Sequence, residues 1–532
     1  MAHTYPEGCF FSTLEEIKGK KITVMGLGLN GGGETCARFF LKHGAFVTVT
    51  DTKTADQLAP AIKSLNSDST IDKSRLRYVL GGHKIEDFAS ADCVIKNPAV
   101  KAEGNEFLAA AKAIETDISI FLKFSKAPLI AVTGSKGKSS TVSAISYGLN
   151  KAGYKCFLGG NITVSPLSFL EKTDGTTPVV LELSSWQLAD LRGRKLLKPR
   201  IAIITKIVPD HQNWYGSMER YVEDKKLIYA DQDKNDITIL DFDEDSYARD
   251  CEHPKAGFRC WGDVFASETK ATVLRYSTHV LPDGIFGVFQ LSDKNGYARL
   301  PIRLMSAHAR QKKRAEELIM KTLQVPGDHM RTNVLNANLA VYLMGVSAEL
   351  TANISASWKG IPHRLEKFHE WQNPYDKRNI AFYNDSSSTV PEAAAAASQS
   401  FGKRTVLIAG GTDKNLDFLP LAKCLNSENN TKFPPYEIFL LSGTGTDKLA
   451  ALLDERKVRY EGPFDSLQIL LEVLKTEFMS ENSSRIFGEV SPDSFLPVVF
   501  SPGATSFGMF TNEFDRGNKF KDLVQAIFQA DS

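Results

Sequence analysis

Short apolar runs alternate with amphipathic helical patterns along most of the chain. Apolar runs occupy 129–132, 179–183 and 201–204, and each leads into a polar or glycine-rich turn. After the first run, Val142, Ile145 and Leu149 fall at helical spacing, so a helix is expected there. Strands that alternate with helices predict open, mostly parallel sheets, and therefore an α/β fold.

The turn after the strand at 129–132 has the residues of a phosphate-binding loop. It reads TGSKGKSS over 133–140, with a helix directly behind it. Gly134 and Gly137 let the backbone curl inward, Lys138 adds a cation, and Ser139 offers a hydroxyl to magnesium. Only two residues separate the first glycine from the Gly-Lys pair, fewer than in the common loop. A plain turn between strand and helix is the alternative.

A second glycine-rich turn follows the strand expected at 21–25. Gly26, Gly28 and Gly31 have the G-x-G-x-x-G spacing, and a helix at 35–43 and a strand at 46–50 come next. Asp51 ends that strand 20 positions after Gly31, where a dinucleotide-binding fold places a ribose ligand. Alone, this turn fits a nicotinamide or flavin enzyme, or a simple packing turn. The phosphate loop at 133–140 disfavours the nicotinamide or flavin interpretation, since hydride transfer needs no second phosphate site, and the packing turn stays an alternative.

Two further strands deliver candidate metal ligands. Glu182 lies in an apolar run, where an unpaired carboxylate is unfavourable, so it is a candidate magnesium ligand rather than an edge charge. His211 follows the strand at 201–204. It could bind a metal or donate to phosphate, although a lone histidine is more often structural.

Composition limits the class of protein. The chain has 532 residues, which suggests about three domains at roughly 150 residues each. A net charge of +1 gives no bulk attraction to nucleic acid or membrane. Seven cysteines without a Cys-x-x-Cys pair indicate reduced thiols, and no signal peptide or membrane-spanning run is visible. We therefore expect a cytoplasmic protein with no nucleic-acid or membrane partner.

Together these motifs resemble the Mur ligase family, the ATP-dependent ligases of peptidoglycan precursors, with folylpolyglutamate synthase as a relative. The loop TGSKGKS carries the likeness, as do ELSSWQL at 182–188, close to the ELSSFQL of the D-glutamate-adding members, and SPGATSF at 501–507. The likeness covers nearly the whole chain except 231–325, which looks like an enlarged insertion. It implies a Rossmann-like UDP-binding domain at 1–125, a P-loop ATPase-type domain at 126–361 and a Rossmann-like amino-acid-binding domain at 362–532.

The resemblance also implies the site residues. ATP contacts would be Gly134, Ser135, Lys136, Gly137, Lys138, Ser139, Ser140, Asn333, Arg364 and Asp385. Contacts to the UDP-linked acceptor would be Leu29, Asn30, Gly31, Asp51, Thr52, Lys53, Asn97 and Asn161. The amino acid would meet Thr389, Lys414, Ser506, Phe507 and Phe514.

Two magnesium ions are implied, one on Ser139 and Glu182, the other on His211 and Lys225. Lys225 would be carbamylated by carbon dioxide, because a carbamate oxygen can ligate magnesium and an ammonium cannot. Lys138, His211 and Lys225 would be the catalytic residues. Without the family, Lys225 would be interpreted as a surface lysine.

At several motif positions this chain departs from the family. Asn97-Pro98-Ala99 replaces Ser-Pro-Gly, and Met330 stands where many relatives have a second asparagine. Ser387 replaces a lysine, Val390 an asparagine and Gly508 an aspartate. Individual contacts at these points are expected to differ.

The implied reaction joins D-glutamate to UDP-N-acetylmuramoyl-L-alanine through an acyl phosphate, catalysed by a monomer. Two alternatives remain. The chain could be a related ligase that adds another amino acid or acts on folate. It could also be a nucleotide-binding ATPase without ligase chemistry, which would hydrolyse ATP without any amino acid.

Overall fold

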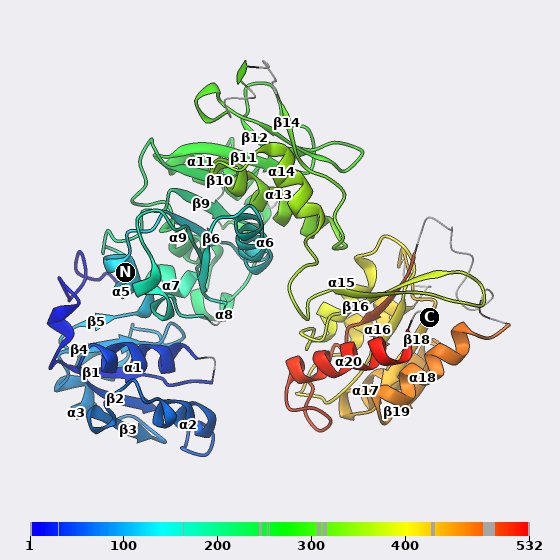
Figure 1. Ribbon diagram of the computed structural model, residues 1–532, viewed down its shortest axis with the longest axis horizontal. Coiled ribbons are helices and arrows are strands. Elements are labelled where there is room, and N and C mark those ends of the chain that lie inside the picture. Colours follow the sequence, from blue (N-terminus) through cyan, green and yellow to red (C-terminus); the bar gives the residue numbers. More distant parts are fainter. Residues whose placement is uncertain are drawn as a thin grey trace. The chain divides into compact units, whose positions relative to one another are not determined.

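The computed structural model describes residues 3–29, 31–162, 164–243, 247–252, 254, 256–305, 310–311, 316–426, 431–481, 483 and 495–529. The predicted site residue Asn30 therefore lies outside the described residues. The chain divides into two compact units, Met1–Thr322 with Thr332–Ser355, and Leu323–Arg331 with Ala356–Ser532 (Figure 1). The described residues form three sheets, and the α/β prediction is confirmed.

The N-terminal sheet is parallel, with strand order β3-β2-β1-β4-β5. Its strands are β1 Lys21–Met25, β2 Phe46–Asp51, β3 Leu76–Leu80, β4 Cys93–Lys96 and β5 Ile114–Glu115. Its helices are α1 Gly32–Lys42, α2 Ala59–Ser67, α3 Ile85–Ala89, α4 Glu106–Ala109 and α5 Asp117–Phe124. The strand order reverses beside β1, so the carboxyl ends of β1 and β4 flank the crevice where such sheets bind ligands.

Helix α1 begins earlier than the sequence predicts, at Gly32 instead of position 35. Gly31 caps it at φ +78°, a conformation that glycine adopts without strain. A Cβ on Gly33 would lie 2.1 Å from the Gly26 carbonyl oxygen. The consecutive glycines therefore let the helix pack directly against the turn that follows β1.

The central sheet has the order β14-β13-β12-β11-β10-β9-β6-β8-β7. Its strands are β6 Leu129–Thr133, β7 Phe157–Gly160, β8 Val179–Glu182, β9 Ile201–Ile204, β10 Ile237–Asp241, β11 Thr272–Ser277, β12 Gly287–Gln290, β13 Gly296–Arg299 and β14 Glu317–Met320. Its helices are α6 Lys138–Lys151, α7 Ser185–Ala189, α8 Gln212–Tyr215, α9 Met218–Lys226, α10 Tyr247–Asp250, α11 Trp261–Glu268, α13 Asp328–Leu343 and α14 Ala348–Ala356.

Segment 231–325, expected as an insertion, continues this sheet. Strands β10 and β11 pair in parallel beyond β9, and β13 and β14 close the edge in antiparallel pairing. The segment thus lengthens the sheet on the side away from β7, and the phosphate-loop strand β6 lies between β8 and β9.

The second unit contains a sheet of order β15-β16-β20-β17-β18-β19. Its strands are β15 Glu366–Gln372, β16 Asn379–Asn384, β17 Val406–Ala409, β18 Glu437–Leu441, β19 Glu461–Phe464 and β20 Phe495–Phe500. Its helices are α15 Pro391–Gln399, α16 Leu419–Leu425, α17 Thr444–Glu455, α18 Leu467–Phe478 and α20 Glu513–Ile527. All neighbours except β15 and β16 pair in parallel, with a separate apolar cluster on each face.

No helix in the described parts of the chain is both long enough and apolar enough to cross a bilayer.

Candidate functional site

The phosphate loop is shaped by two glycines that no other residue could replace without displacement. Gly134 has φ +143° and Gly137 has φ +96°. A Cβ at Gly134 would come within 2.0 Å of Thr205 Oγ1, and one at Gly137 within 2.3 Å of Asn333 Oδ1. The loop is therefore packed tightly between β9 and α13, and Asn333 lies directly against it.

Hydrogen bonds hold the phosphate loop in its conformation. The Lys138 ammonium donates to the carbonyls of Gly134 (2.9 Å) and Ser135 (3.0 Å). The backbone N–H groups of Ser135 and Lys136 both donate to the Lys206 carbonyl. Gly137 is the N-cap of α6, so the helix begins directly at the loop, and the N-terminus of a helix is a favourable place for a phosphate.

Glu182 has the environment expected of a cation ligand. It ends β8 opposite Val132 of β6 and is 1% exposed. Its Oε1 accepts from Asn161 Nδ2 at 2.9 Å, and no donor in the described structure reaches Oε2. A buried carboxylate with one open oxygen, beside a phosphate loop that offers Ser139, fits a magnesium ion.

Lys225 is buried, so the interpretation as a surface lysine is wrong. It is 1% exposed on α9, and its Nζ donates to the Gly134 carbonyl at 2.9 Å, the same oxygen that Lys138 uses. Burial, reinforced by the Lys138 charge, holds the pKa of Lys225 well below its ordinary value. Lys225 is therefore suited to be a neutral amine.

The adjacent Lys226 has the opposite environment. It forms ion pairs with Glu223 (2.7 Å) and Glu268 (3.0 Å). Although burial opposes its charge, these carboxylates raise the pKa of Lys226. The two neighbouring lysines, which sequence could separate only by family spacing, are thus distinguished by geometry.

His211 occupies a strained position next to the loop. It has φ +51°, unusual for a residue other than glycine, and its ring centroid lies 4.9 Å from that of Trp186 on α7. Nearby, Tyr221 of α9 donates to Ser135 Oγ at 3.0 Å, which ties α9 to the loop.

No group of three or more His, Cys, Asp or Glu side chains in the described chain could hold a metal ion by itself. A cation here would need hydroxyl, phosphate or water oxygens as well.

Most of the predicted acceptor residues lie at the carboxyl ends of β1, β2 and β4, along one edge of the N-terminal sheet. Asp51 accepts from the N–H groups of Gly28 (3.0 Å) and Lys53 (2.9 Å), so its carboxylate holds both turns. A Cβ on Gly26 would lie 3.2 Å from the Asn97 amide nitrogen, so the Asn97 side chain packs over the glycine turn. Leu29 is exposed beside them. Gly31 and Thr52 belong to the same edge. Asn161 does not, since it follows β7 of the central sheet and donates to Glu182 there.

Most of the predicted site residues in the second unit lie in the loops after β16, β17 and β20. These strands are neighbours, so their carboxyl ends meet at one edge of the sheet. Asp385 accepts from the Leu365 N–H (3.1 Å) and from Ser501 Oγ (2.6 Å), and burial raises its pKa to about 7. Backbone hydrogen bonds between Thr412 and Thr505 join the two other loops.

The amino-acid candidates Lys414, Ser506 and Phe507 lie on these joined loops. Ser506 is buried, whereas Lys414 and Phe507 are exposed. Thr389 and Phe514 come from the segments after β16 and at the start of α20. The structure thus collects these residues around one sheet edge within the unit.

Sequence analysis missed Thr205 and Tyr221 as parts of the phosphate site. Both contact the loop from other elements, Thr205 through hydrogen bonds to the carbonyls of Thr133 and Lys136. Nothing in the local pattern marks them, because the contacts cross between neighbouring strands and from α9.

A nucleotide-binding enzyme is indicated by the phosphate loop, the buried Glu182 beside it and the α/β sheets. Comparison with known proteins identifies its family. Residues 132–341 match the Mur ligase middle domain, and residues 20–120 match the MurD-like N-terminal domain of Mur ligases. The chain is 40% identical to the UDP-N-acetylmuramoylalanine–D-glutamate ligase of Treponema pallidum (strain Nichols), over 96% of this chain and 99% of the relative. It is 36% identical to the ligase of the same name from Borreliella afzelii (strain PKo), over 97% and 99%.

The fold is shared with solved Mur ligases. The crystal structure of UDP-N-acetylmuramate-alanine ligase MurC from Thermotoga maritima matches with a TM-score of 0.51 at 17% identity, over 95% of this chain and 99% of that one. The chain belongs to the Mur ligase family.

We expect Gly137→Ala to raise the KM for ATP by about tenfold or more, because the new methyl would displace Asn333 from the loop. Gly153→Ala is the matched control. Gly153 follows α6 at φ +91°, and no described atom lies within 4 Å of the point that a Cβ would occupy. An alanine there has the same backbone strain as Gly137→Ala but contacts no neighbouring residue. Steady-state kinetics with varied ATP checks this. An equal KM for ATP in both variants would contradict it.

Proposed function

We propose that this chain is a cytoplasmic, monomeric ligase that joins D-glutamate to UDP-N-acetylmuramoyl-L-alanine with ATP, in peptidoglycan precursor synthesis. The observation that carries the proposal is the near full-length similarity to two ligases of that name, at 40% and 36% identity. The burial of Lys225 at the phosphate loop supports it, because a simple ATPase has no need of another lysine there besides Lys138.

Each substrate is assigned to one segment of the chain. Residues 1–125 would bind the UDP-linked acceptor, 126–361 ATP, and 362–532 the amino acid. Arg364 and Asp385 remain predicted contacts of ATP. Substrates held on separate segments imply that the segments come together during the catalytic cycle.

The reaction would proceed in two steps. An oxygen of the alanine carboxylate attacks the γ-phosphorus of ATP, the bond to ADP breaks, and an acyl phosphate forms. Lys138 and the N–H groups at the start of α6 stabilise the charge on the transferring phosphoryl group. The D-glutamate amine then attacks the acyl carbon, and the tetrahedral intermediate expels phosphate.

Magnesium, when bound, would offset the repulsion between the γ-phosphate and the acceptor carboxylate. Ser139 and Glu182 would hold one ion, and His211 with a carbamate on Lys225 the other. The open Oε2 of Glu182 supports the first assignment.

The carbamate follows from the chemistry of Lys225. A neutral amine attacks the carbon of carbon dioxide, a C–N bond forms, and the proton passes to solvent, leaving an anion. The low pKa of Lys225 favours the neutral amine. Because Lys138 donates to the same Gly134 carbonyl as Lys225, an anionic carbamate on Lys225 would lie close to the Lys138 ammonium and be attracted to it.

The amino acid would bind to Thr389, Lys414, Ser506, Phe507 and Phe514. Lys414 supplies a cation for a side-chain carboxylate, as a dicarboxylic amino acid requires. The hydrogen bonds between Thr412 and Thr505 support a common pocket, since they fix the two loops that carry most of these residues.

The proposal predicts phosphate release from ATP only when UDP-N-acetylmuramoyl-L-alanine and D-glutamate are both present. Each candidate amino acid is added in turn to enzyme, ATP and the nucleotide. Release with L-glutamate, lysine or alanine instead would assign a different ligase. Release that needs neither partner would contradict ligase chemistry altogether.

A further inference from the structure

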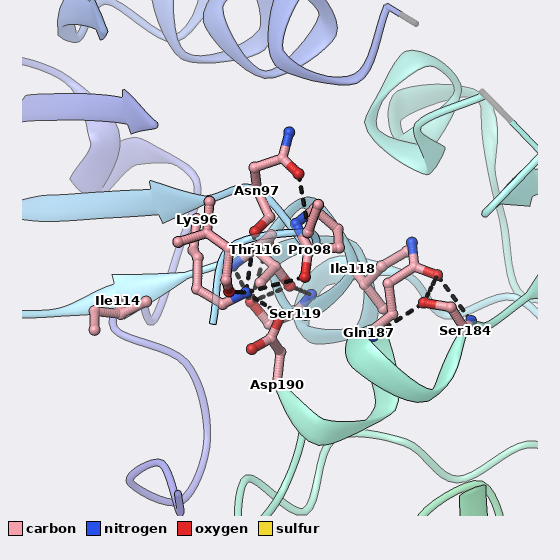
Figure 2. Close-up of polar contacts among 12 residues, drawn as sticks. Lys96, Asn97, Pro98, Ile114, Thr116, Ile118, Ser119, Ser184, Gln187 and Asp190 are labelled. Atoms are coloured by element: carbon pink, nitrogen blue, oxygen red, sulfur yellow. Dashed lines mark hydrogen bonds and ion pairs between the residues drawn. The ribbon is translucent and has the colours of Figure 1, made fainter. Parts of the chain in front are cut away.

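Lys96 is a buried cation at the junction of the N-terminal and central sheets, inside the first compact unit. It is the last residue of β4, and its side chain is 2% exposed. Its Nζ lies 2.9 Å from Oδ2 of Asp190, the residue that follows α7. Figure 2 shows this ammonium between the loop after β4 and the end of α7.

The same ammonium also closes the loop that follows β4. It donates to the carbonyls of Asn97 (3.0 Å) and Val100 (2.7 Å), with the Pro98 carbonyl at 3.5 Å. An ammonium has three donors and no acceptor, so one Lys96 can satisfy several carbonyls of a turn at once. The loop therefore folds around Lys96, and Asp190 fixes that cation to the central domain.

The buried Asp190 carboxyl has a partner for each of its oxygens. Its Oδ1 accepts from the Tyr5 hydroxyl at 3.0 Å. Burial raises the pKa of Asp190 to about 6, and the Lys96 ammonium opposes that rise. The 2.9 Å contact between the Lys96 ammonium and the Asp190 carboxylate makes this a buried ion pair, in which loss of one partner leaves an uncompensated charge.

Side-chain packing on this side of the loop is weak. A cavity of about 460 Å³ borders Pro98 and Val100, and its other walls include Trp186 and Trp214. On its other side Val100 packs against the apolar cluster that contains Phe88 and Val94, so this packing and the polar contacts of Lys96 together position the loop. Asn97, which packs over the glycine turn after β1, lies in this same loop.

We infer that Lys96 is a positioning residue that, through Asp190, fixes the loop 97–100 in the conformation that binds the UDP-linked acceptor. It has no part in the chemical steps. The inference rests on the proposed function, which assigns Asn97 to that acceptor. The expected signature is a change in acceptor affinity without a change in turnover.

The test uses Lys96→Met, Asp190→Asn and the double variant in the full-length protein. In Lys96→Met we expect hydrogen–deuterium exchange of the Ala99 and Val100 amides, which donate to Asn97, to rise by about tenfold or more without ligand. The KM for UDP-N-acetylmuramoyl-L-alanine should rise by about tenfold, with kcat and the KM for ATP within about twofold of wild type. The double variant should regain thermal stability relative to either single variant, because no buried charge is left unpaired, yet keep the raised KM.

Glu115→Gln is the matched control. Glu115 forms an equally buried ion pair with Arg194 across the same junction, at 3.0 Å, without a hydrogen bond to the loop in the described structure. Glu115→Gln should lower the thermal stability of the protein and leave the KM for UDP-N-acetylmuramoyl-L-alanine unchanged. A rise in the acceptor KM as large as that of Lys96→Met would show a general effect of the junction and overturn the inference.

The outcomes separate the two proposals. Unchanged exchange in Lys96→Met would overturn the role of Lys96 in holding the loop, whatever the enzyme does. Raised exchange with an unchanged acceptor KM would overturn its role in binding and leave the ligase assignment intact. A wild-type enzyme that does not consume the nucleotide would overturn the proposed function, and with it the role in acceptor binding.

Discussion

Lys225→Ala should lower kcat of the ligase reaction by about 1,000-fold or more, and a short carboxylic acid such as acetate should restore part of it. The substitution removes the proposed carbamate and leaves a space at a site that is 1% exposed. A small carboxylate can enter that space and supply the missing anionic oxygen. The measurement is kcat at saturating substrates, with and without acetate.

Lys226→Ala provides the control, because Lys226 is the next residue on the same helix but pairs with Glu223 and Glu268. It should keep near wild-type kcat and show no response to acetate. In ¹³C-bicarbonate buffer, wild type should show a carbamate carbon signal by NMR that Lys225→Ala lacks. Unchanged activity in Lys225→Ala, or an equal loss in Lys226→Ala, would exclude the carbamate role.

Glu182→Gln should lower kcat by about 100-fold and raise the magnesium concentration needed for half-maximal activity. Glutamine preserves shape and can still accept from Asn161, but it has no anionic oxygen to replace the open Oε2 of Glu182. The measurement is the magnesium dependence of turnover at fixed ATP.

The variant Glu115→Gln again serves for comparison, since it also removes a buried carboxylate in the first unit, but one that is paired with Arg194. We expect its magnesium dependence to match wild type. If Glu182→Gln kept the wild-type magnesium requirement while losing activity, Glu182 would be needed for folding or orientation and not for the cation.

Features with a local cause could be predicted from sequence. The strand before the phosphate loop lies within a residue of its predicted bounds, because an apolar run and the glycine after it act over short distances. The order of β1, β2 and the glycine turn followed from the same signals. The α/β class came from their alternation.

Features that depend on contacts between distant parts of the chain could not be predicted from the sequence. Lys225 and Lys226 look alike in sequence, and only the packing of α9 against the Gly134 carbonyl separates them. That segment 231–325 continues the central sheet could not be predicted, because strand pairing between β9 and β10 is not written in either strand alone. A lysine at the end of β4 gave no signal that Asp190, far along the chain, would meet it.

The central claim is that ATP activates the alanine carboxylate before the amino acid attacks it. The direct measurement supplies UDP-N-acetylmuramoyl-L-alanine with ¹⁸O in the alanine carboxylate, together with ATP and D-glutamate, and analyses the released phosphate by mass spectrometry. An acyl phosphate transfers one carboxylate oxygen to phosphate, so each phosphate should carry one ¹⁸O, in amounts equal to the amide formed. Phosphate without label would mean that water or another group accepts the phosphoryl group, and would contradict the mechanism.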